Sequence, residues 1–122
     1  MRGEAARECV KVLKQNGLLV LVADRDFSAK GKIIDFFGKP TLMPAGPAIF
    51  SLHSGAPIIP AIIIRLPDDK FALFFEEPIQ VSPTTNREED IKKIISAYIK
   101  VFEKYIRLYP EQWYMFRKFW IE

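Results

Sequence analysis

Two carboxylates around an arginine, Asp24-Arg25-Asp26, are the side chains best placed for chemistry, because they directly follow the apolar run 18–23. Ligands of α/β sheets collect at the carboxyl ends of strands, so a carboxylate here is suited to hold a hydroxyl, an amine or an arginine. The alternative is a turn in which the acids accept hydrogen bonds from backbone amides. Two carboxylates without a third ligand are weak grounds for a metal site.

Three lysines flank the acid pair, at Lys30, Lys32 and Lys39. Cationic side chains near a cleft suit the phosphates of a lipid head group or an acyl carrier, and solvated surface lysines are the alternative. The single histidine, His53, has Ile58 five positions later rather than an acid. Because a general base needs an orienting partner within reach, we expect a structural or surface role for His53.

The elements that must position these residues follow from hydrophobic spacing. A helix is predicted around Ala6, Cys9, Val10 and Leu13, with Gly17 just past its end. Residues 18–23 read as a strand buried on both faces, 24–32 as a loop, and 33–37 as a short apolar segment.

A second helix should begin near Pro47 and end at Gly55. Residues 57–64 are predicted as a buried strand in which Pro60 marks a bulge or an edge, and 71–75 as its antiparallel neighbour. A capping box formed by Asn86 and Glu89 should start a long helix that reaches about Tyr109. The sequence therefore predicts an α/β fold.

Composition bounds the function. The chain has 122 residues, a net charge of +3 and one cysteine, and its pI is about 9.0. This length fits one domain or part of one. The mild basicity suits an anionic lipid surface and is too weak to argue for nucleic acid. One cysteine excludes an intrachain disulfide and a multi-cysteine zinc site. No apolar run reaches the ~18 residues of a membrane-spanning helix.

The C-terminal tail mixes aromatic and basic side chains: Trp113, Tyr114, Arg117, Lys118 and Trp120. Such a mixture suits a membrane interface, with the rings at head-group depth and the cations on lipid phosphates. Aromatic side chains that cover the core of the preceding helix are an equally good interpretation. Both remain open at the level of sequence.

Five motifs, in order along the chain, resemble the bacterial lipid A biosynthesis acyltransferases, a pattern shared by the actinobacterial phosphatidylinositol mannoside acyltransferases. They are the acidic block 22–26, the aromatic block 34–40 closed by Gly38, the segment 44–48, the segment 52–60, and the signature 106–114. The chain departs from the family at Met115, where a second tryptophan is common, and at Arg117, where histidine is usual.

The resemblance implies a mixed sheet flanked by helices, with residues 1–122 as the C-terminal part of an acyltransferase domain. It implies transfer of a fatty acyl chain from acyl carrier protein or acyl-CoA to a lipid A precursor or related glycolipid, with no cofactor or metal. The implied place is the cytoplasmic face of the bacterial inner membrane, in lipopolysaccharide biosynthesis. The implied substrate-binding residues are Asp24, Arg25, Asp26, Phe36, Phe37, Gly38, Pro57 and Pro60.

The family's catalytic His-x4-Asp motif does not occur in these 122 residues. We therefore expect no activity from the chain alone, and whether it works as an enzyme stays open. The alternative is a non-catalytic homologue that serves as a lipid-binding or protein-interaction module. The two apolar strands should need further neighbours, so we also expect self-association through an unpaired strand edge.

Overall fold

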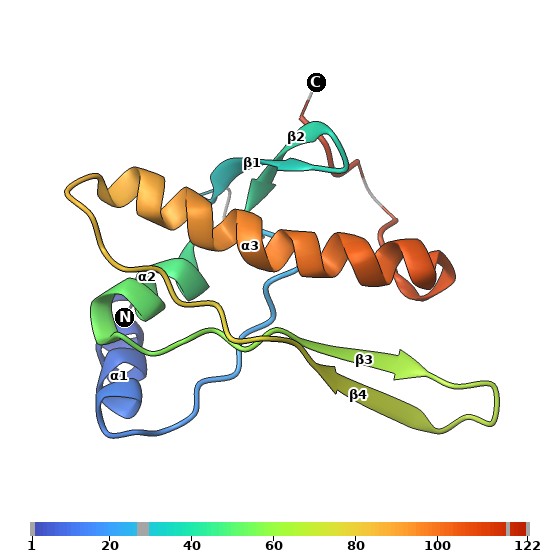
Figure 1. Ribbon diagram of the computed structural model, residues 1–122, viewed down its shortest axis with the longest axis horizontal. Coiled ribbons are helices and arrows are strands. Elements are labelled where there is room, and N and C mark those ends of the chain that lie inside the picture. Colours follow the sequence, from blue (N-terminus) through green and yellow to red (C-terminus); the bar gives the residue numbers. More distant parts are fainter. Residues whose placement is uncertain (1, 27–29, 117, 122) are drawn as a thin grey trace.

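The computed structural model describes residues 2–26, 30–116 and 118–121. The order of elements is α1 (Arg2–Lys14), β1 (Lys32–Phe36), β2 (Lys39–Met43), α2 (Gly46–Ser54), β3 (Ala61–Arg65), β4 (Phe71–Phe75), α3 (Arg87–Leu108) and the short 3₁₀ helix η1 (Pro110–Gln112). The α/β class is confirmed. The strands of the described residues form two antiparallel hairpins, β1–β2 and β3–β4, on either side of the long helix α3 (Figure 1).

Helix α3 is the centre of the packing. The Asn86 side chain accepts a hydrogen bond of 3.2 Å from the Glu89 amide, which confirms the predicted N-cap. The other half of the predicted box is replaced, because the Asn86 amide donates to the Thr84 hydroxyl at 3.1 Å. One stripe of α3 is fully buried against β1, β2 and α2: Ile91, Ile94, Ile95, Tyr98 and Ile99. The phenol of Tyr98 donates to the carbonyl of Pro44 at 2.7 Å, which ties the start of α2 to this helix.

Hairpin β1–β2 was not anticipated, since the sequence indicates residues 33–37 only as a short apolar segment and predicts no strand after Gly38 and Pro40. Its register pairs Phe36 with Lys39, so the turn has two residues, Phe37 and Gly38. Both have positive φ, 52° and 79°, as a type I′ turn requires. Phenylalanine is unusual at positive φ, which is why the turn lacks a recognisable sequence signal.

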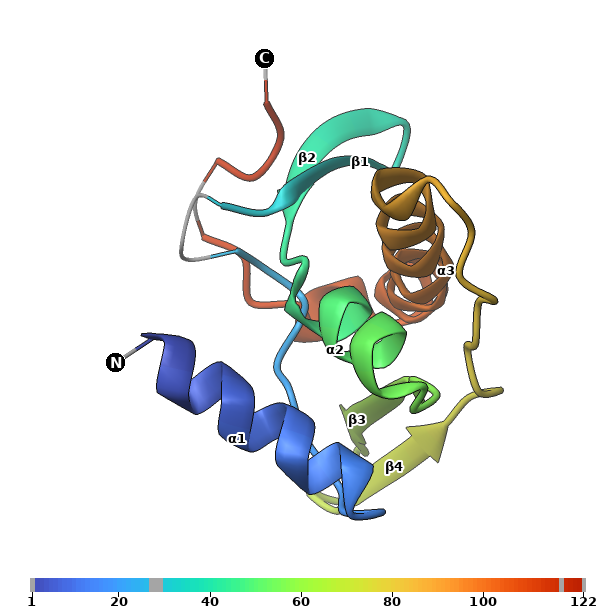
Figure 2. The same ribbon diagram turned by 90° about the vertical axis from the view of Figure 1, so that its left-hand side faces the viewer.

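Helix α2 has the predicted limits. Pro47 lies in its first turn, and Gly55 ends it with a left-handed φ of 78° and an amide bonded to the Ser51 carbonyl. Figure 2 shows α1 lying along the same side of the molecule as α2, and the two helices are in contact. His53 is exposed at the end of α2, as expected for a surface role.

The predicted buried strand at residues 18–23 is wrong. The segment joins no strand, and among the described residues no backbone hydrogen bond reaches it. Leu18, Val20 and Val22 are 84%, 81% and 83% exposed. An apolar run predicts burial on both faces only when neighbouring strands supply hydrogen bonds and a covering surface. Here none of the described strands pairs with the segment, and only Leu19 and Ala23 are half-buried.

The strand predicted at 57–64 is also corrected in its limits and in its burial. Strand β3 begins at Ala61, after Pro60, and pairs antiparallel with β4 as predicted. Within β3, Ile64 is buried, whereas Ile63 is 65% exposed. The strand is half-covered because its inner face alone lies toward the body of the molecule.

Candidate functional site

The acid pair is partly buried and internally paired. Arg25 donates to the carboxylate of Asp24 at 2.8 Å, and both side chains are roughly three-quarters covered. The hydrogen bond from the guanidinium to Asp24 raises the pKa of Arg25. The two side chains act as one neutral unit whose remaining carboxylate and guanidinium edges can bond a polar ligand.

Asp26 has a different position. Its carboxylate accepts a 2.7 Å hydrogen bond from the amide of Gly31, which closes the loop before β1. Gly31 lies so close to the carbonyl of Met43 that a Cβ there would collide with it. Asp26 therefore makes the backbone bond expected of a turn residue, at the open end of hairpin β1–β2. Part of this loop, residues 27–29, lies outside the described chain.

The aromatic motif lies at the other end of the same hairpin. Phe36 is 1% exposed in the core, and Gly38 is exposed in the turn. Five residues of strand, at about 3.3 Å each, separate this turn from the loop that contains Asp26. The structure therefore does not bring the acid pair and the Phe-Phe-Gly motif together in one place.

A buried carboxylate holds the hairpin turn, and the sequence did not single it out. Glu103 on α3 is 2% exposed and accepts a 2.8 Å hydrogen bond from the amide of Phe37. Lys100 lies 3.4 Å from the same side chain, and the guanidinium of Arg107 lies 4.9 Å from the centre of the Phe37 ring. The sequence did offer one signal: Glu103 lies four residues after Ile99 and so shares the buried stripe of the helix, where a carboxylate needs a partner.

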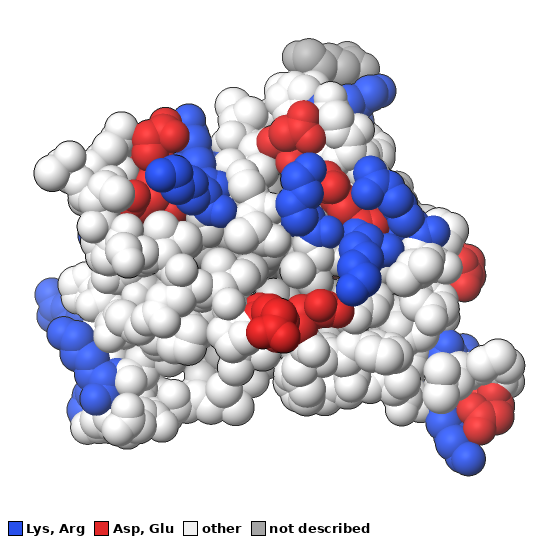
Figure 3. All heavy atoms as spheres, viewed as in Figure 1, with Lys and Arg blue, Asp and Glu red and all other residues white. Residues whose placement is uncertain are grey.

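Charges are unevenly spread over the face shown in Figure 3. Basic and acidic side chains alternate along α3 and gather again at the tip of β3–β4. An acidic group lies near the middle of the view below α3, and basic side chains lie at the lower left over α1. Near the end of α3, the Lys104 ammonium is 3.2 Å from Glu76, and the phenol of Tyr105 also donates to Glu76. The Tyr105 hydrogen bond, with help from Lys104, lowers the pKa of Glu76.

The predicted proline pair lies in the connection from α2 to β3. Pro57 is exposed, whereas Pro60 is buried and its carbonyl accepts a 3.0 Å hydrogen bond from the amide of Glu76. The carbonyl of Pro60 thus faces β4 and makes the hydrogen bond that precedes the paired residues of β3 and β4. Neither proline contacts the acid pair or the aromatic turn through any polar bond in the described residues.

Most of the aromatic tail covers hairpin β1–β2. The indole of Trp120 donates to the Phe36 carbonyl at 2.8 Å, and the rings of Trp113 and Phe119 lie edge-on to Phe36 at 5.6 and 5.3 Å. Tyr114 is 62% exposed. Of the two cations predicted to contact a membrane, Lys118 is exposed and Arg117 lies outside the described residues. Trp113 and Trp120 therefore serve as a cover for the core.

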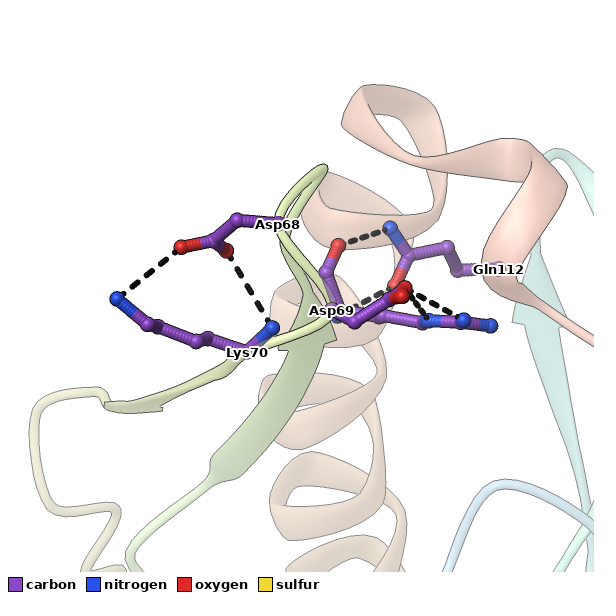
Figure 4. A network of polar contacts seen from close by, with 5 residues as sticks. Asp68, Asp69, Lys70 and Gln112 are labelled. Atoms are coloured by element: carbon purple, nitrogen blue, oxygen red, sulfur yellow. Dashed lines mark hydrogen bonds and ion pairs between the residues drawn. The ribbon is translucent and has the colours of Figure 1, made fainter.

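Gln112 links the C-terminal signature to the second hairpin (Figure 4). Its amide oxygen accepts from the Arg65 amide at 2.8 Å, and its amide nitrogen donates to the Arg65 carbonyl at 2.9 Å. The Arg65 guanidinium also pairs with Asp69 at 2.6 Å. The side chain of Gln112 thus occupies the place of a neighbouring strand at the end of β3, and the signature 106–114 joins both hairpins to α3.

Within the described part of the chain, no three potential metal-ligating side chains lie together. None of the described helices is long and apolar enough to cross a bilayer.

Comparisons with known proteins place the chain among acyltransferases. A family model described as bacterial lipid A biosynthesis acyltransferase matches residues 1–122. The chain belongs to this family. It is 31% identical over 113 residues to proteins named phosphatidylinositol mannoside acyltransferase from two strains of Mycobacterium tuberculosis. It is also 31% identical over 109 residues to the protein of that name from Mycolicibacterium smegmatis.

These matches cover 89% of this chain and 33% or 34% of the relatives. The chain thus spans about a third of the length of the curated relatives that it matches.

Proposed function

We propose that this chain supplies the sheet-and-helix portion of an enzyme that transfers a fatty acyl group from a thioester donor to a hydroxyl of a glycolipid. The family match over residues 1–122 carries this proposal. The relatives at 31% identity are named as acyltransferases of a mannosylated phosphatidylinositol, which favours a glycolipid acceptor. The donor is acyl carrier protein or acyl-CoA, and the acceptor is a lipid A precursor or a related glycolipid.

In this reaction the acceptor hydroxyl attacks the thioester carbonyl, the acyl–oxygen bond forms, and the thiol leaves with a proton. The step needs a general base for the hydroxyl. His53 is exposed at the end of α2 and no carboxylate lies five positions on, so we do not assign it that role. Our proposal is that the base is not among these 122 residues and that the chain alone is inactive.

The polar contact with the acceptor is assigned to the pair Asp24–Arg25. Its side chains are partly exposed and already desolvated on one side, so they present a carboxylate and a guanidinium to sugar hydroxyls or phosphate. Asp26 supports the same loop through Gly31. Phe37, Gly38 and the Pro57 segment are proposed as walls for the acyl chain, on the strength of the family motif rather than of a shared cavity.

The proposed location is the cytoplasmic face of a bacterial inner membrane, as a peripheral protein in lipid metabolism. The net charge of +3 suits an anionic bilayer surface. Within the tail, Tyr114, Phe116 and Lys118 are described residues exposed for such contact. The alternative, a lipid-binding or protein-interaction module without catalysis, is favoured by the large exposed apolar side chains of β3–β4.

A chimera tests the proposal. Residues 1–122 replace the matching third of the Mycolicibacterium smegmatis acyltransferase, and acyl transfer from radiolabelled acyl-CoA to phosphatidylinositol mannoside is measured in membranes. We expect activity from the chimera and none from the isolated chain. A folded, membrane-bound chimera without activity would favour the binding module, and turnover by the isolated chain that His53→Ala abolishes would overturn the assignment of the base.

The acid pair is tested in the same chimera. Asp24→Asn should lower the rate at least tenfold, because the hydroxyl groups of the glycolipid substrate would lose the charged carboxylate to which they donate hydrogen bonds. Asp68→Asn is the matched control, since Asp68 is an exposed carboxylate at the tip of β3–β4 that pairs with Lys70. Equal rates for the two variants would remove Asp24 from the site and leave the family assignment intact.

A further inference from the structure

The outer edge of β3 can be read from the hydrogen-bond pattern of its hairpin. The Leu66 amide donates to the Lys70 carbonyl, and the Glu76 amide donates to the Pro60 carbonyl. Because hydrogen-bonded pairs alternate along an antiparallel ladder, Pro60, Ile62, Ile64 and Leu66 direct their backbone groups toward β4. Ala61, Ile63 and Arg65 therefore direct their N–H and C=O groups away from β4.

The backbone groups of this outer edge are hydrogen-bonded at one end, at Arg65, and, among the described residues, unbonded next to it, at Ile63 and Ala61. Gln112 bonds both the N–H and the C=O of Arg65. At the other end the strand begins at Ala61, because Pro60 directs its carbonyl toward β4 and lies outside β3. Between these limits, no hydrogen bond from the described residues reaches the outward backbone groups of Ala61 and Ile63. The free edge thus presents two donors and two acceptors, on residues two positions apart.

The side chains beside this edge are apolar and exposed. Ile63, Phe71, Leu73 and Phe75 share the outer face of the hairpin, because directly paired residues point to the same side of a sheet. Their exposed fractions are 65%, 68%, 52% and 67%. In the view of Figure 1, β3 lies between β4 and α3, and the tip of the hairpin projects beyond the rest of the molecule.

The chemistry of the edge favours a strand as its occupant. A lipid acyl chain can cover Ile63 and Phe71 but offers nothing to the N–H groups of Ala61 and Ile63, whose burial without partners costs free energy. The tip between β3 and β4 carries Asp68 and Asp69, which also oppose insertion into a bilayer. A second extended backbone satisfies the edge and covers its side chains together.

We propose that the occupant is β3 of a second copy of this chain, paired antiparallel about a two-fold axis at Ile62. In this register Ala61 faces Ile63 of the second copy, and Ile63 faces its Ala61. Each pair exchanges two hydrogen bonds, so four bonds use every free group of both edges. The bond of Gln112 to Arg65 ends the pairing on both sides, which makes this register self-complementary.

The contact joins the hairpins into a four-stranded sheet in the order β4, β3, β3, β4. It buries much less than the ~1,600 Å² of a standard stable interface, because each edge contributes two residues. We therefore expect a reversible dimer in the micromolar range rather than an obligate one. The proposal concerns this chain alone and does not rest on its acyltransferase role.

Cross-linking tests the register. In a Cys9→Ser background, Ala61→Cys and Ile63→Cys are made as two separate proteins. Facing residues of a hydrogen-bonded pair have Cα atoms about 5.5 Å apart, within the range of a disulfide. Under mild oxidation, an equimolar mixture should give a covalent dimer, while each variant alone should not. Strong cross-linking of either variant alone, or none in the mixture, would overturn the proposed register.

Sedimentation at 1–100 µM gives an independent measurement. Wild type should show a dimer that Ile63→Lys weakens at least tenfold, since the variant puts like charges across the edge. Leu73→Lys is the matched control, on the same apolar face but on the other strand. Its dissociation constant should change much less. A wild type that is monomeric throughout, or equal weakening by both variants, would exclude edge pairing. Circular dichroism checks that both variants fold.

Discussion

The two hairpins of this chain have strands of the same length, five residues each, and opposite environments. Hairpin β1–β2 has Phe36, Thr41 and Met43 essentially fully buried, between α3 and the aromatic tail. Hairpin β3–β4 exposes Phe71 and Phe75 by about two-thirds each. Apolar composition alone thus does not determine burial, which depends on whether another element reaches the surface.

The hairpins also differ in how their turns are held. The Phe37–Gly38 turn is fixed from outside, because Glu103 on α3 binds the Phe37 amide and Arg107 covers the ring. The turn of β3–β4 is fixed by its own residues, through the Arg65–Asp69 ion pair. The first hairpin is part of the core, whereas the second has one firm attachment at Gln112 and another at Glu76.

The largest difference between the hairpins should appear on truncating one phenylalanine in each. Phe36→Ala removes a fully buried ring and should destabilise the protein by about 3–5 kcal/mol. Phe71→Ala removes an exposed ring and should change the free energy of unfolding by less than about 0.5 kcal/mol. Urea unfolding at 25 °C measures both. Similar losses of stability in the two variants would mean that β3–β4 is covered in solution. If the cover is a second copy of the chain, the loss of stability in Phe71→Ala would vary with protein concentration.

The anchor of the first turn should give the next largest effect. Glu103→Ala leaves the Phe37 amide without its acceptor and should cost about 1–3 kcal/mol. Glu103→Gln retains an oxygen at the same place, so it should recover part of this loss. Hydrogen exchange of the Phe37 amide should accelerate in the Ala variant and less in the Gln variant. Glu111→Ala, at an exposed position, controls for charge, and an equal effect there would refute the anchor.

The elements of this contrast were predictable in part. Local signals sufficed for α1, α2 and α3, because helix spacing, Gly55 and the Asn86 cap act within one turn. The antiparallel pairing of β3 with β4 followed from a polar turn between two apolar runs. The β1–β2 hairpin was missed, since Phe37 has a positive φ that is unusual for its residue type and its amide is held by Glu103 on α3. No local pattern encodes that distant bond.

The candidate site was predictable to a smaller extent. The acid pair was located from its position after an apolar run, although that run forms no strand and Asp26 proves to bond Gly31. For the tail, membrane contact and cover of the core are equally good interpretations of the sequence. Trp113 and Trp120 lie against Phe36, which agrees with the second. Glu103 and Gln112 were not singled out, because their partners are backbone groups 66 and 47 residues away.

The attachment of the second hairpin through Gln112 should have a moderate effect. Gln112→Ala removes two exposed hydrogen bonds and should lower stability by about 1 kcal/mol. The change should concentrate at β3, so hydrogen exchange of the Arg65 amide should accelerate while that of Phe37 stays constant. Gln15→Ala, an exposed glutamine after α1, is the control. Uniform acceleration across both hairpins would mean that Gln112 stabilises the whole fold rather than one strand end.

The smallest expected effect is a pH dependence at the second attachment, Glu76. The hydrogen bond from Tyr105, together with Lys104, lowers the pKa of Glu76 in the folded chain. A carboxyl with a lowered folded pKa stabilises the protein fully above its unfolded pKa of about 4.3 and loses this contribution as pH falls through the folded value. The stability difference between wild type and Glu76→Gln should therefore be largest near pH 7 and shrink below about pH 4. Urea unfolding from pH 3 to 7 measures it, with the neighbouring Glu77→Gln as control. If this stability difference were constant from pH 3 to 7, the negative charge of Glu76 would play no part. Glu76 would then attach β4 to α3 through hydrogen bonds that form equally well whether its carboxyl group is protonated or ionised.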